Sequence, residues 1–208
     1  MNFYDKYIKR FFDILIGLVA LVGFGWVYII IAIVVKKNMG SPVLYTAERI
    51  GKDGRIFNLY KFRSMTNDVD ADGNLLPDVD RLTKFGRLLR ATSLDEIPEA
   101  INILKGDMSL IGPRPLPTIY FPYYTDEEFH RHDVRPGLSG LAQANGRNSL
   151  SWEEKFKYDL EYVENISLFL DIEIIVKTVV KVLNRADIGQ GEEMPESLHR
   201  ERAGQKYR

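Results

Sequence analysis

The chain has 208 residues, of which 45% are hydrophobic and 27% charged, and its formal net charge is -1. This size suits one domain with a hydrophobic core, and the balanced charge argues against a nucleic-acid-binding protein, which would carry a basic excess. There is no cysteine, so thiol nucleophiles, disulfides and cysteine metal sites are excluded. The three histidines, His130, His132 and His199, lack the spacing of a zinc site.

The first predicted element is an apolar run from Phe11 to Val35, which only Asp13 interrupts. A straight helix of this length can cross a bilayer core of about 30 Å. Basic residues stand at both ends of the run, and the positive-inside rule favours the cytoplasm for each of them. We therefore expect a re-entrant helix that enters and leaves the same leaflet. The alternative is a single span with the N-terminus outside.

A β-hairpin is predicted next, since two extended segments, Val43 to Arg49 and Ile56 to Met65, flank the glycine-rich residues 51–54. Lys61 and Arg63 share one face of the second strand because side chains alternate with a period of two. They are candidate ligands for an anion, and a solvated strand end is the alternative.

An acidic segment and a short basic helix follow the hairpin. Residues 68–80 begin like a calcium-binding loop, but Val79 stands where a bidentate glutamate is required, so an acidic surface loop is predicted. Residues 81–90 are predicted to form a basic amphipathic helix. Its last residue, Arg90, lies five residues before Asp95 and is a candidate phosphate ligand.

The central predicted helix lies between residues 94 and 106, where apolar residues recur at helical spacing and a Lys-Gly pair ends the pattern. Pro98 has no N–H and is tolerated only in a first turn, which predicts a helix start near Asp95. Asp95 and Glu96 would then lie at the positive end of the helix, which favours ionised carboxylates. Ser93 and Glu96 also match a capping box, so an ordinary helix start is the alternative explanation.

Basic residues surround this acid pair. Upstream are Arg81, Lys84, Arg87 and Arg90, and downstream a predicted strand, residues 108–111, leads into a Gly-Pro-Arg-Pro turn that presents Arg114. An acid pair among permanent cations indicates an anionic substrate.

Three segments carry a resemblance to a known family: KFRSM at residues 61–65, SLDEIPEAINILKGDMSLIGPRP at 93–115 and RPGLSGLAQANGRN at 135–148. From its apolar N-terminus to about Leu183 the chain resembles the bacterial sugar transferases called monotopic phosphoglycosyl transferases. It is most similar to the small form typified by the PglC enzymes of protein N-glycosylation. Their re-entrant helix is commonly bent at a Ser-Pro pair, whereas this sequence has Gly23-Phe24-Gly25-Trp26 there.

The resemblance implies a two-step reaction that initiates glycoconjugate assembly. Asp95 would attack the β-phosphate of a UDP-sugar, release UMP and hold the phosphosugar until undecaprenyl phosphate accepts it. Mg²⁺ is the implied cofactor and Asp95 its contact, while Glu96 would handle protons or position the metal and acceptor. The other implied substrate ligands are Lys61, Arg63, Arg90, Arg114, Arg135, Arg147 and Asp159.

The predicted fold class is α+β. Residues 1–37 form a membrane-embedded, re-entrant helix, and residues 38–184 a mainly helical catalytic domain with a β-hairpin and amphipathic interfacial helices. Residues 185–208 are predicted to be a polar, mobile tail. One such interfacial helix is predicted over residues 166–183, and another helix starts at a Ser151–Glu154 capping box.

The expected partners are membrane lipids, undecaprenyl phosphate and a UDP-sugar, with UDP-N,N′-diacetylbacillosamine implied by nearness to the PglC group. The expected location is the cytoplasmic face of a bacterial inner membrane, and no nucleic acid is expected. Two alternatives remain at this stage: a membrane-bound, metal-dependent phosphohydrolase that uses the same acids, and a non-catalytic membrane scaffold.

Overall fold

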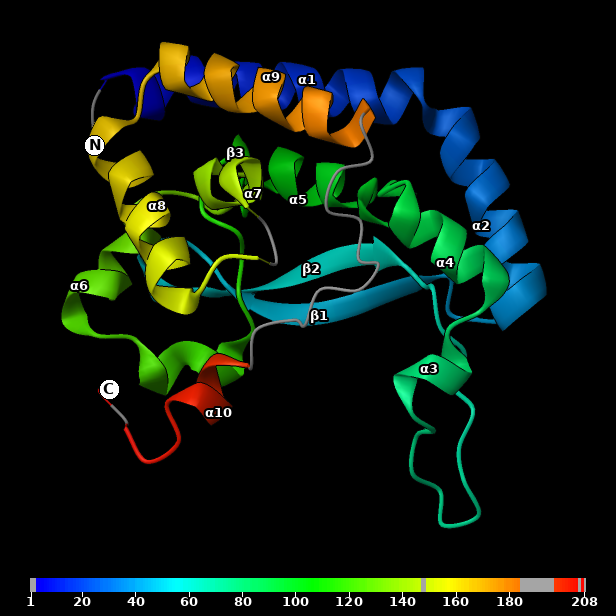
Figure 1. Cartoon of the computed structure of the whole chain (residues 1–208). Coiled ribbons are helices and arrows are strands. Elements are labelled where there is room, and N and C mark those ends of the chain that lie inside the picture. Colours follow the sequence, from blue (N-terminus) through cyan, green and yellow to red (C-terminus); the bar gives the residue numbers. More distant parts are fainter. Residues whose placement is uncertain (1–2, 147–148, 184–196, 206, 208) are drawn as a thin grey trace.

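The structure is a computed structural model that describes residues 3–146, 149–183, 197–205 and 207. Its fold combines helices with two small two-stranded sheets, as the α+β prediction requires. In Figure 1, α1 (Arg10–Gly23) and α9 (Leu168–Leu183) run along the top. The short helices α5 (Glu99–Lys105) and α7 (Leu141–Asn145) lie beneath them, above the hairpin.

The apolar N-terminal run is broken into two helices. A π-helical turn (Tyr4–Lys9) leads into α1, and α2 (Gly25–Met39) follows with a bend of 62°. Across the described part of the chain, no single helix has both the length and the apolar character to cross a membrane. The two helices of this bent pair, taken together, have that length and composition. The break falls at Phe24, between two glycines, which permit a bend without proline.

Polar side chains on α1 attach it to the rest of the domain. Asp13 is buried and accepts hydrogen bonds from the Ser109 hydroxyl at 2.9 Å and the Leu110 N–H at 2.8 Å. Arg10 donates to the Leu104 carbonyl at 2.9 Å, at the C-terminal end of α5, where a cation is favourable. The one acid in the apolar run is therefore a structural anchor.

The beginning of α9 is tied to the N-terminus through Asp171. Its carboxylate accepts hydrogen bonds from Lys9 at 2.7 Å, from the Tyr4 hydroxyl at 2.6 Å and from the Tyr162 hydroxyl at 2.7 Å. Tyr162 belongs to α8 (Trp152–Asn165), which starts with the predicted Ser151 capping box. These bonds hold the N-terminal π-helical turn, α8 and α9 together, and they satisfy the hydrogen-bonding capacity of a buried acid.

The predicted hairpin is confirmed. Strands β1 (Leu44–Ile50) and β2 (Ile56–Phe62) pair antiparallel. Asn102, fully buried on α5, donates to the Asn58 carbonyl at 2.7 Å and accepts from the Tyr60 N–H at 3.1 Å, so β2 lies against α5. This contact brings Lys61, next along β2, to the start of α5.

The basic helix predicted over residues 81–90 is two helices in the structure, α3 (Asp78–Arg81) and α4 (Lys84–Ala91). Thr83 separates them because its side chain caps α4, accepting from the Gly86 N–H at 2.8 Å. The predicted strand at 108–111 appears as β3 (Ser109–Ile111), which pairs in parallel with β4 (Gly137–Ser139). A further short helix is α6 (Asp126–Phe129).

The predicted mobile tail is docked where the structure describes it; residues 184–196 lie outside the described ranges. Helix α10 (Leu198–Glu201) buries Leu198 completely against Trp152 and its neighbours. Arg202 then forms two hydrogen bonds with the Glu128 carboxylate, at 2.6 and 2.7 Å. Sequence analysis missed these anchors because they depend on side chains far away along the chain, 74 positions in the case of Arg202 and Glu128.

Candidate active site

The acid pair lies in a tight 3₁₀ turn, Leu94–Glu96, and not in the first turn of a helix. The predicted helix start near Asp95 is therefore wrong, because α5 begins only at Glu99, after Pro98. The predicted capping box is also wrong: Ser93 adopts the left-handed conformation, with φ of 54°, and its side chain makes no capping hydrogen bond. That conformation turns the chain sharply after α4.

Glu96 sits between two of the predicted cations. Lys61 Nζ lies 2.6 Å from Glu96 Oε1, and an Arg114 guanidinium nitrogen lies 3.4 Å from the same oxygen. Burial acts to raise the pKa of Glu96, but the charges of Arg114 and Lys61 outweigh it and hold that pKa below its ordinary value. Glu96 is thus an ionised acid that joins the hairpin to the Gly-Pro-Arg-Pro turn.

Glu99 is a third acid in this cluster, which sequence analysis missed. It is 3% exposed, and its Oε1 lies 3.2 Å from Lys61 Nζ, so Lys61 bridges two carboxylates. Burial, together with the charge of Glu96, raises the pKa of Glu99 to about 7 despite the opposing effect of Lys61. Glu99 follows Glu96 by three residues, and this separation could have been recognised as helix-face spacing.

Substituting Glu99→Gln should change the pH dependence of stability. The unfolded carboxyl ionises near 4.5 and the folded one near 7, so the native state holds more protons between these pH values and wild-type stability falls as pH rises through them. Glutamine stays neutral and removes that fall. We expect the free energy of unfolding to increase by about 1 to 3 kcal/mol relative to wild type at pH 8, and to be unchanged at pH 4.

Urea unfolding in detergent at the two pH values measures this difference. Glu164→Gln, at an exposed position of α8, is the matched control. An equal effect of Glu99→Gln at pH 4 and pH 8 would contradict the assignment.

Asp95 is 9% exposed, and its charged neighbours are Lys61, Glu96 and Arg90. Burial raises its pKa, with Lys61 and Arg90 acting in the opposite direction. The expectation that a helix terminus favours ionisation of Asp95 is therefore wrong, because that terminus lies elsewhere and the side chain is largely desolvated. Arg90 itself donates from Nε to the Ser64 hydroxyl at 2.9 Å.

Asp159 acts on the site through Arg131, which sequence analysis also missed. Both side chains are buried, and two guanidinium nitrogens of Arg131 lie 2.7 and 2.9 Å from Asp159 Oδ2. Arg131 also donates to the backbone carbonyl of Arg114 at 2.8 Å. The pair thus holds the turn from which the Arg114 side chain reaches Glu96.

Two predicted ligands are engaged elsewhere. Arg63 is buried and donates to the carbonyls of Pro42 at 2.9 Å and Met65 at 3.4 Å, so it links the segments that flank the hairpin and does not project alongside Lys61. Arg135 donates to the Gly106 carbonyl at 3.1 Å, at the opposite end of α5 from Glu99.

The prediction for Arg147 falls outside the described residues. The glycine-rich run before it serves close backbone packing: a Cβ at Gly137 would lie 2.1 Å from the Gly112 nitrogen, and one at Gly140 would lie 2.2 Å from the Gly112 carbonyl oxygen.

A large groove is lined by Glu96, the second acid of the pair. Its volume is about 1160 Å³, and its polar lining includes Glu96, Arg90 and Arg114. Much of the remaining lining is apolar and comes from α1, α2, α5 and α9, including Ala20, Val27, Ala100, Ile103 and Val179. The groove therefore combines charged side chains, among them Glu96, with apolar walls from α1, α2, α5 and α9.

Within the described ranges, no three or more histidine or acidic side chains form a group that could hold a metal ion on its own. Mg²⁺ commonly binds through only one or two carboxylates together with substrate phosphates. The neighbouring acids Asp95 and Glu96 fit that mode of binding.

Adjacent acids bordered by lysine and arginine are residue types that can bind a phosphorylated, anionic substrate. The chain belongs to the bacterial sugar transferase family, whose sequence profile matches residues 4–185. The resemblance noted from the sequence motifs is thereby confirmed, and the protein is a transferase.

Three relatives illustrate the family. A sugar transferase of Bacillus subtilis named EpsL is 49% identical, covering 88% of this chain and 91% of its own length. A UDP-N-acetylgalactosamine-undecaprenyl-phosphate N-acetylgalactosaminephosphotransferase of Aeromonas hydrophila is 37% identical over 85% of this chain and 44% of its own. The undecaprenyl-phosphate galactose phosphotransferase of Salmonella typhimurium is 36% identical, over 87% of this chain and 41% of its own length. The chain spans less than half the length of the latter two.

Proposed function

We propose that this protein is a phosphoglycosyl transferase, which moves a phosphosugar from a UDP-sugar to undecaprenyl phosphate. The observation that carries the proposal is the cluster of Asp95 and Glu96 with Lys61, Arg90 and Arg114. Carboxylates serve as nucleophiles toward phosphorus, and the arginine fork suits phosphoryl oxygens. The names of two relatives, from Aeromonas hydrophila and Salmonella typhimurium, specify this kind of acceptor and transfer.

The proposed reaction has two displacements. In the first, a carboxylate oxygen of Asp95 attacks the β-phosphorus of the UDP-sugar, the bond from that phosphorus to the bridging oxygen breaks, and its electron pair leaves with UMP. In the second, a phosphate oxygen of undecaprenyl phosphate attacks the same phosphorus and the Asp95 carboxylate leaves. Lys61, Arg90 and Arg114 stabilise charge on the phosphoryl oxygens during both steps.

Mg²⁺ is proposed as cofactor, with Asp95 and Glu96 as its protein contacts. When bound, it reduces the repulsion between a carboxylate and a diphosphate. Its charge also favours the ionised form of a neighbouring carboxyl, which opposes the effect of burial on Asp95.

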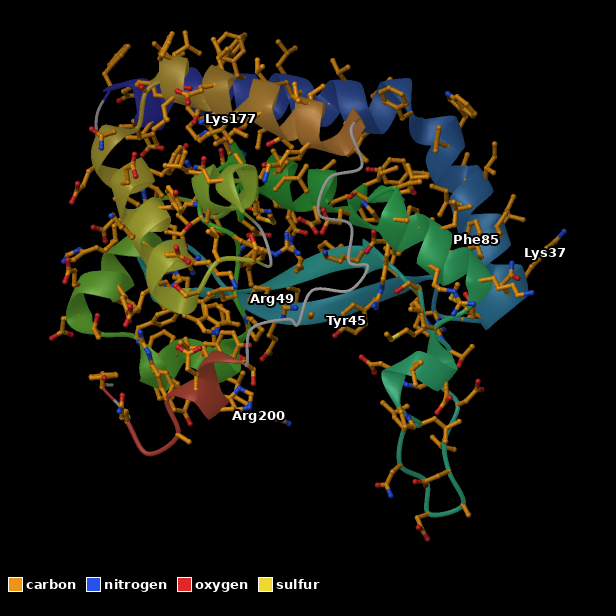
Figure 2. The ribbon with its side chains drawn as sticks, viewed as in Figure 1. Lys37, Tyr45, Arg49, Phe85, Lys177 and Arg200 are labelled. Atoms are coloured by element: carbon orange, nitrogen blue, oxygen red, sulfur yellow. The ribbon has the colours of Figure 1, made fainter. Side chains whose placement is uncertain are left out.

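We propose that the bent N-terminal helices α1 and α2 enter one leaflet and that α9 lies at the membrane surface. Large apolar side chains are exposed along these helices, among them Phe11, Val22, Trp26, Phe169 and Val176. Figure 2 supports this arrangement, since side chains stand outward along the top of α1 and α9. Because UDP-sugars are cytosolic, the proposed location is the cytoplasmic face of a bacterial inner membrane.

This placement brings the lipid acceptor to the acids. A polyprenyl chain leaves the bilayer only at a large cost in apolar exposure, so its phosphate must be reached at headgroup level. The apolar walls of the groove suit the first part of that chain, and the cations Arg90 and Arg114 in its lining suit the phosphate.

Radiolabelled UDP-sugars, incubated with the purified protein, undecaprenyl phosphate and Mg²⁺ in detergent, test the function. We expect label in the lipid fraction and one UMP released for each lipid labelled. Inorganic phosphate or free sugar phosphate without labelled lipid would indicate a phosphohydrolase instead, and no turnover of any sugar would support a scaffold. The panel must contain several sugars, including UDP-N,N′-diacetylbacillosamine, because the relatives are named for galactose and N-acetylgalactosamine.

A further inference from the structure

A second, smaller pocket shares Arg114 and Leu116 with the groove. Its volume is about 110 Å³, well below the size of a pocket that encloses a whole drug-sized ligand, so it suits one group of a larger substrate. The lining includes Lys61, Glu99 and Arg114, which belong to the acid cluster, and Arg49, which neither the sequence motifs nor the acid cluster include.

Backbone pairing brings Arg49 to this pocket. Arg49 lies on β1 opposite Phe57, so it shares a face of the hairpin with Lys61, four residues further along β2. Arg49 also forms an antiparallel bridge with Pro117, and the Ile50 N–H donates to the Leu116 carbonyl at 3.1 Å. The chain that leaves Arg114 therefore runs along the edge of β1.

No carboxylate of the described residues forms an ion pair with Arg49, and the acid whose charge acts on it from the same pocket is Glu99. The hydrogen bond of Arg49 goes to the neighbouring backbone, the Glu48 carbonyl at 2.8 Å. Lys61 and Arg114, by contrast, each pair with Glu96. Burial lowers the pKa of Arg49 and the nearby Arg114 guanidinium acts in the same direction, whereas the charges of Tyr45 and Glu99 oppose them. The charged lining of the pocket consists of three cations, Arg49, Lys61 and Arg114, and one acid, Glu99, so positive charge is in excess there.

We propose that Arg49 is a further substrate-binding residue, which with Arg114 binds a phosphoryl oxygen of the nucleotide diphosphate in this pocket. The inference rests on the proposed transferase function and adds a residue from β1 to the donor site. Figure 2 labels Arg49 on the hairpin near the centre of the molecule, in contrast with Arg200 and Lys37, which lie at its outer edge.

Arg49→Gln tests the proposal, with Arg55→Gln, an exposed arginine just before β2, as the matched control. We expect the KM for the UDP-sugar to rise about tenfold to a hundredfold in Arg49→Gln, because a charge-assisted hydrogen bond is lost. The KM for undecaprenyl phosphate should not change, and Arg55→Gln should behave as wild type. An unchanged donor KM in a folded Arg49→Gln variant overturns the inference.

Direct binding separates this inference from the proposed function. Calorimetric titration with inorganic pyrophosphate and Mg²⁺ needs no turnover, and we expect wild type to bind at least tenfold more tightly than Arg49→Gln. If wild type transfers no sugar but this difference in pyrophosphate binding is found, the result supports the anion site and contradicts the transferase function. If transfer is found and both proteins bind pyrophosphate equally, the role of Arg49 fails.

A conservative variant keeps the proposal testable if Arg49→Gln does not fold. Arg49→Lys keeps the positive charge but lacks the planar fork, so its donor KM should rise at least about threefold. A wild-type donor KM in Arg49→Lys, with Arg49→Gln unfolded by circular dichroism, also overturns the inference, because the arginine would then serve only the fold.

Discussion

Asp95→Asn is expected to abolish the covalent phosphosugar adduct and to lower kcat by at least about a thousandfold. The amide has nearly the same shape as the carboxyl, so the 3₁₀ turn should persist, but it is a poor nucleophile toward phosphorus. Asp95 is largely buried and has Lys61 and Arg90 as charged neighbours. The loss should therefore come from chemistry, and the donor KM should change much less than kcat.

Mass spectrometry of protein quenched with UDP-sugar, before the lipid is added, measures the adduct. Asp72→Asn, in the exposed acidic loop, is the control for an equivalent change of charge. An adduct of wild-type abundance on the Asp95→Asn protein would remove Asp95 from the role of nucleophile. If the adduct moved to Glu96, the roles of the two acids would be exchanged.

Arg131→Met should destabilise the protein by about 3 to 5 kcal/mol, since it leaves the buried Asp159 without its partner. It should also lower kcat, because the carbonyl of Arg114 loses the donor that holds its turn. Arg131 touches no substrate group in this account, so it is a positioning residue. Thermal unfolding in detergent and initial rates at saturating substrates measure the two effects, with the exposed Arg200→Met as control.

The double variant Arg131→Met with Asp159→Leu distinguishes positioning from stability. Replacing both members of a buried ion pair by apolar residues is often neutral for stability, so most of the lost stability should return. The turn still lacks its donor, and kcat should remain about tenfold below wild type. Full recovery of kcat in the double variant would show that the pair serves stability alone.

Local patterns predicted much of the fold. The hairpin and the Ser151 capping box both follow from residues within a few positions of one another. Turn glycines, capping side chains and strand periodicity act over that range. The start of α5 was misplaced because Pro98 is compatible with several positions at the beginning of a helix, and the left-handed Ser93 was not foreseen.

The site was only partly predictable from local patterns. Lys61, Glu96 and Arg114 were identified and meet in the structure, but Arg63 and Arg135 use their guanidinium groups on backbone carbonyls instead. An arginine in a family motif can bind an anion or hold a chain segment, and its residue type does not distinguish these roles. Only the position of the neighbouring carbonyls decides between them.

The sequence by itself determined that an acid pair, several permanent cations and an apolar N-terminal run occur in one chain without cysteine, and that their motifs are those of a sugar transferase family. Tertiary structure alone decided that Lys61 bridges Glu96 and Glu99, that Arg131 holds the backbone of Arg114, and that burial raises the pKa of Asp95. These properties depend on desolvation and on contacts between distant segments. Such contacts exist only once the hairpin, α5 and α8 have packed together.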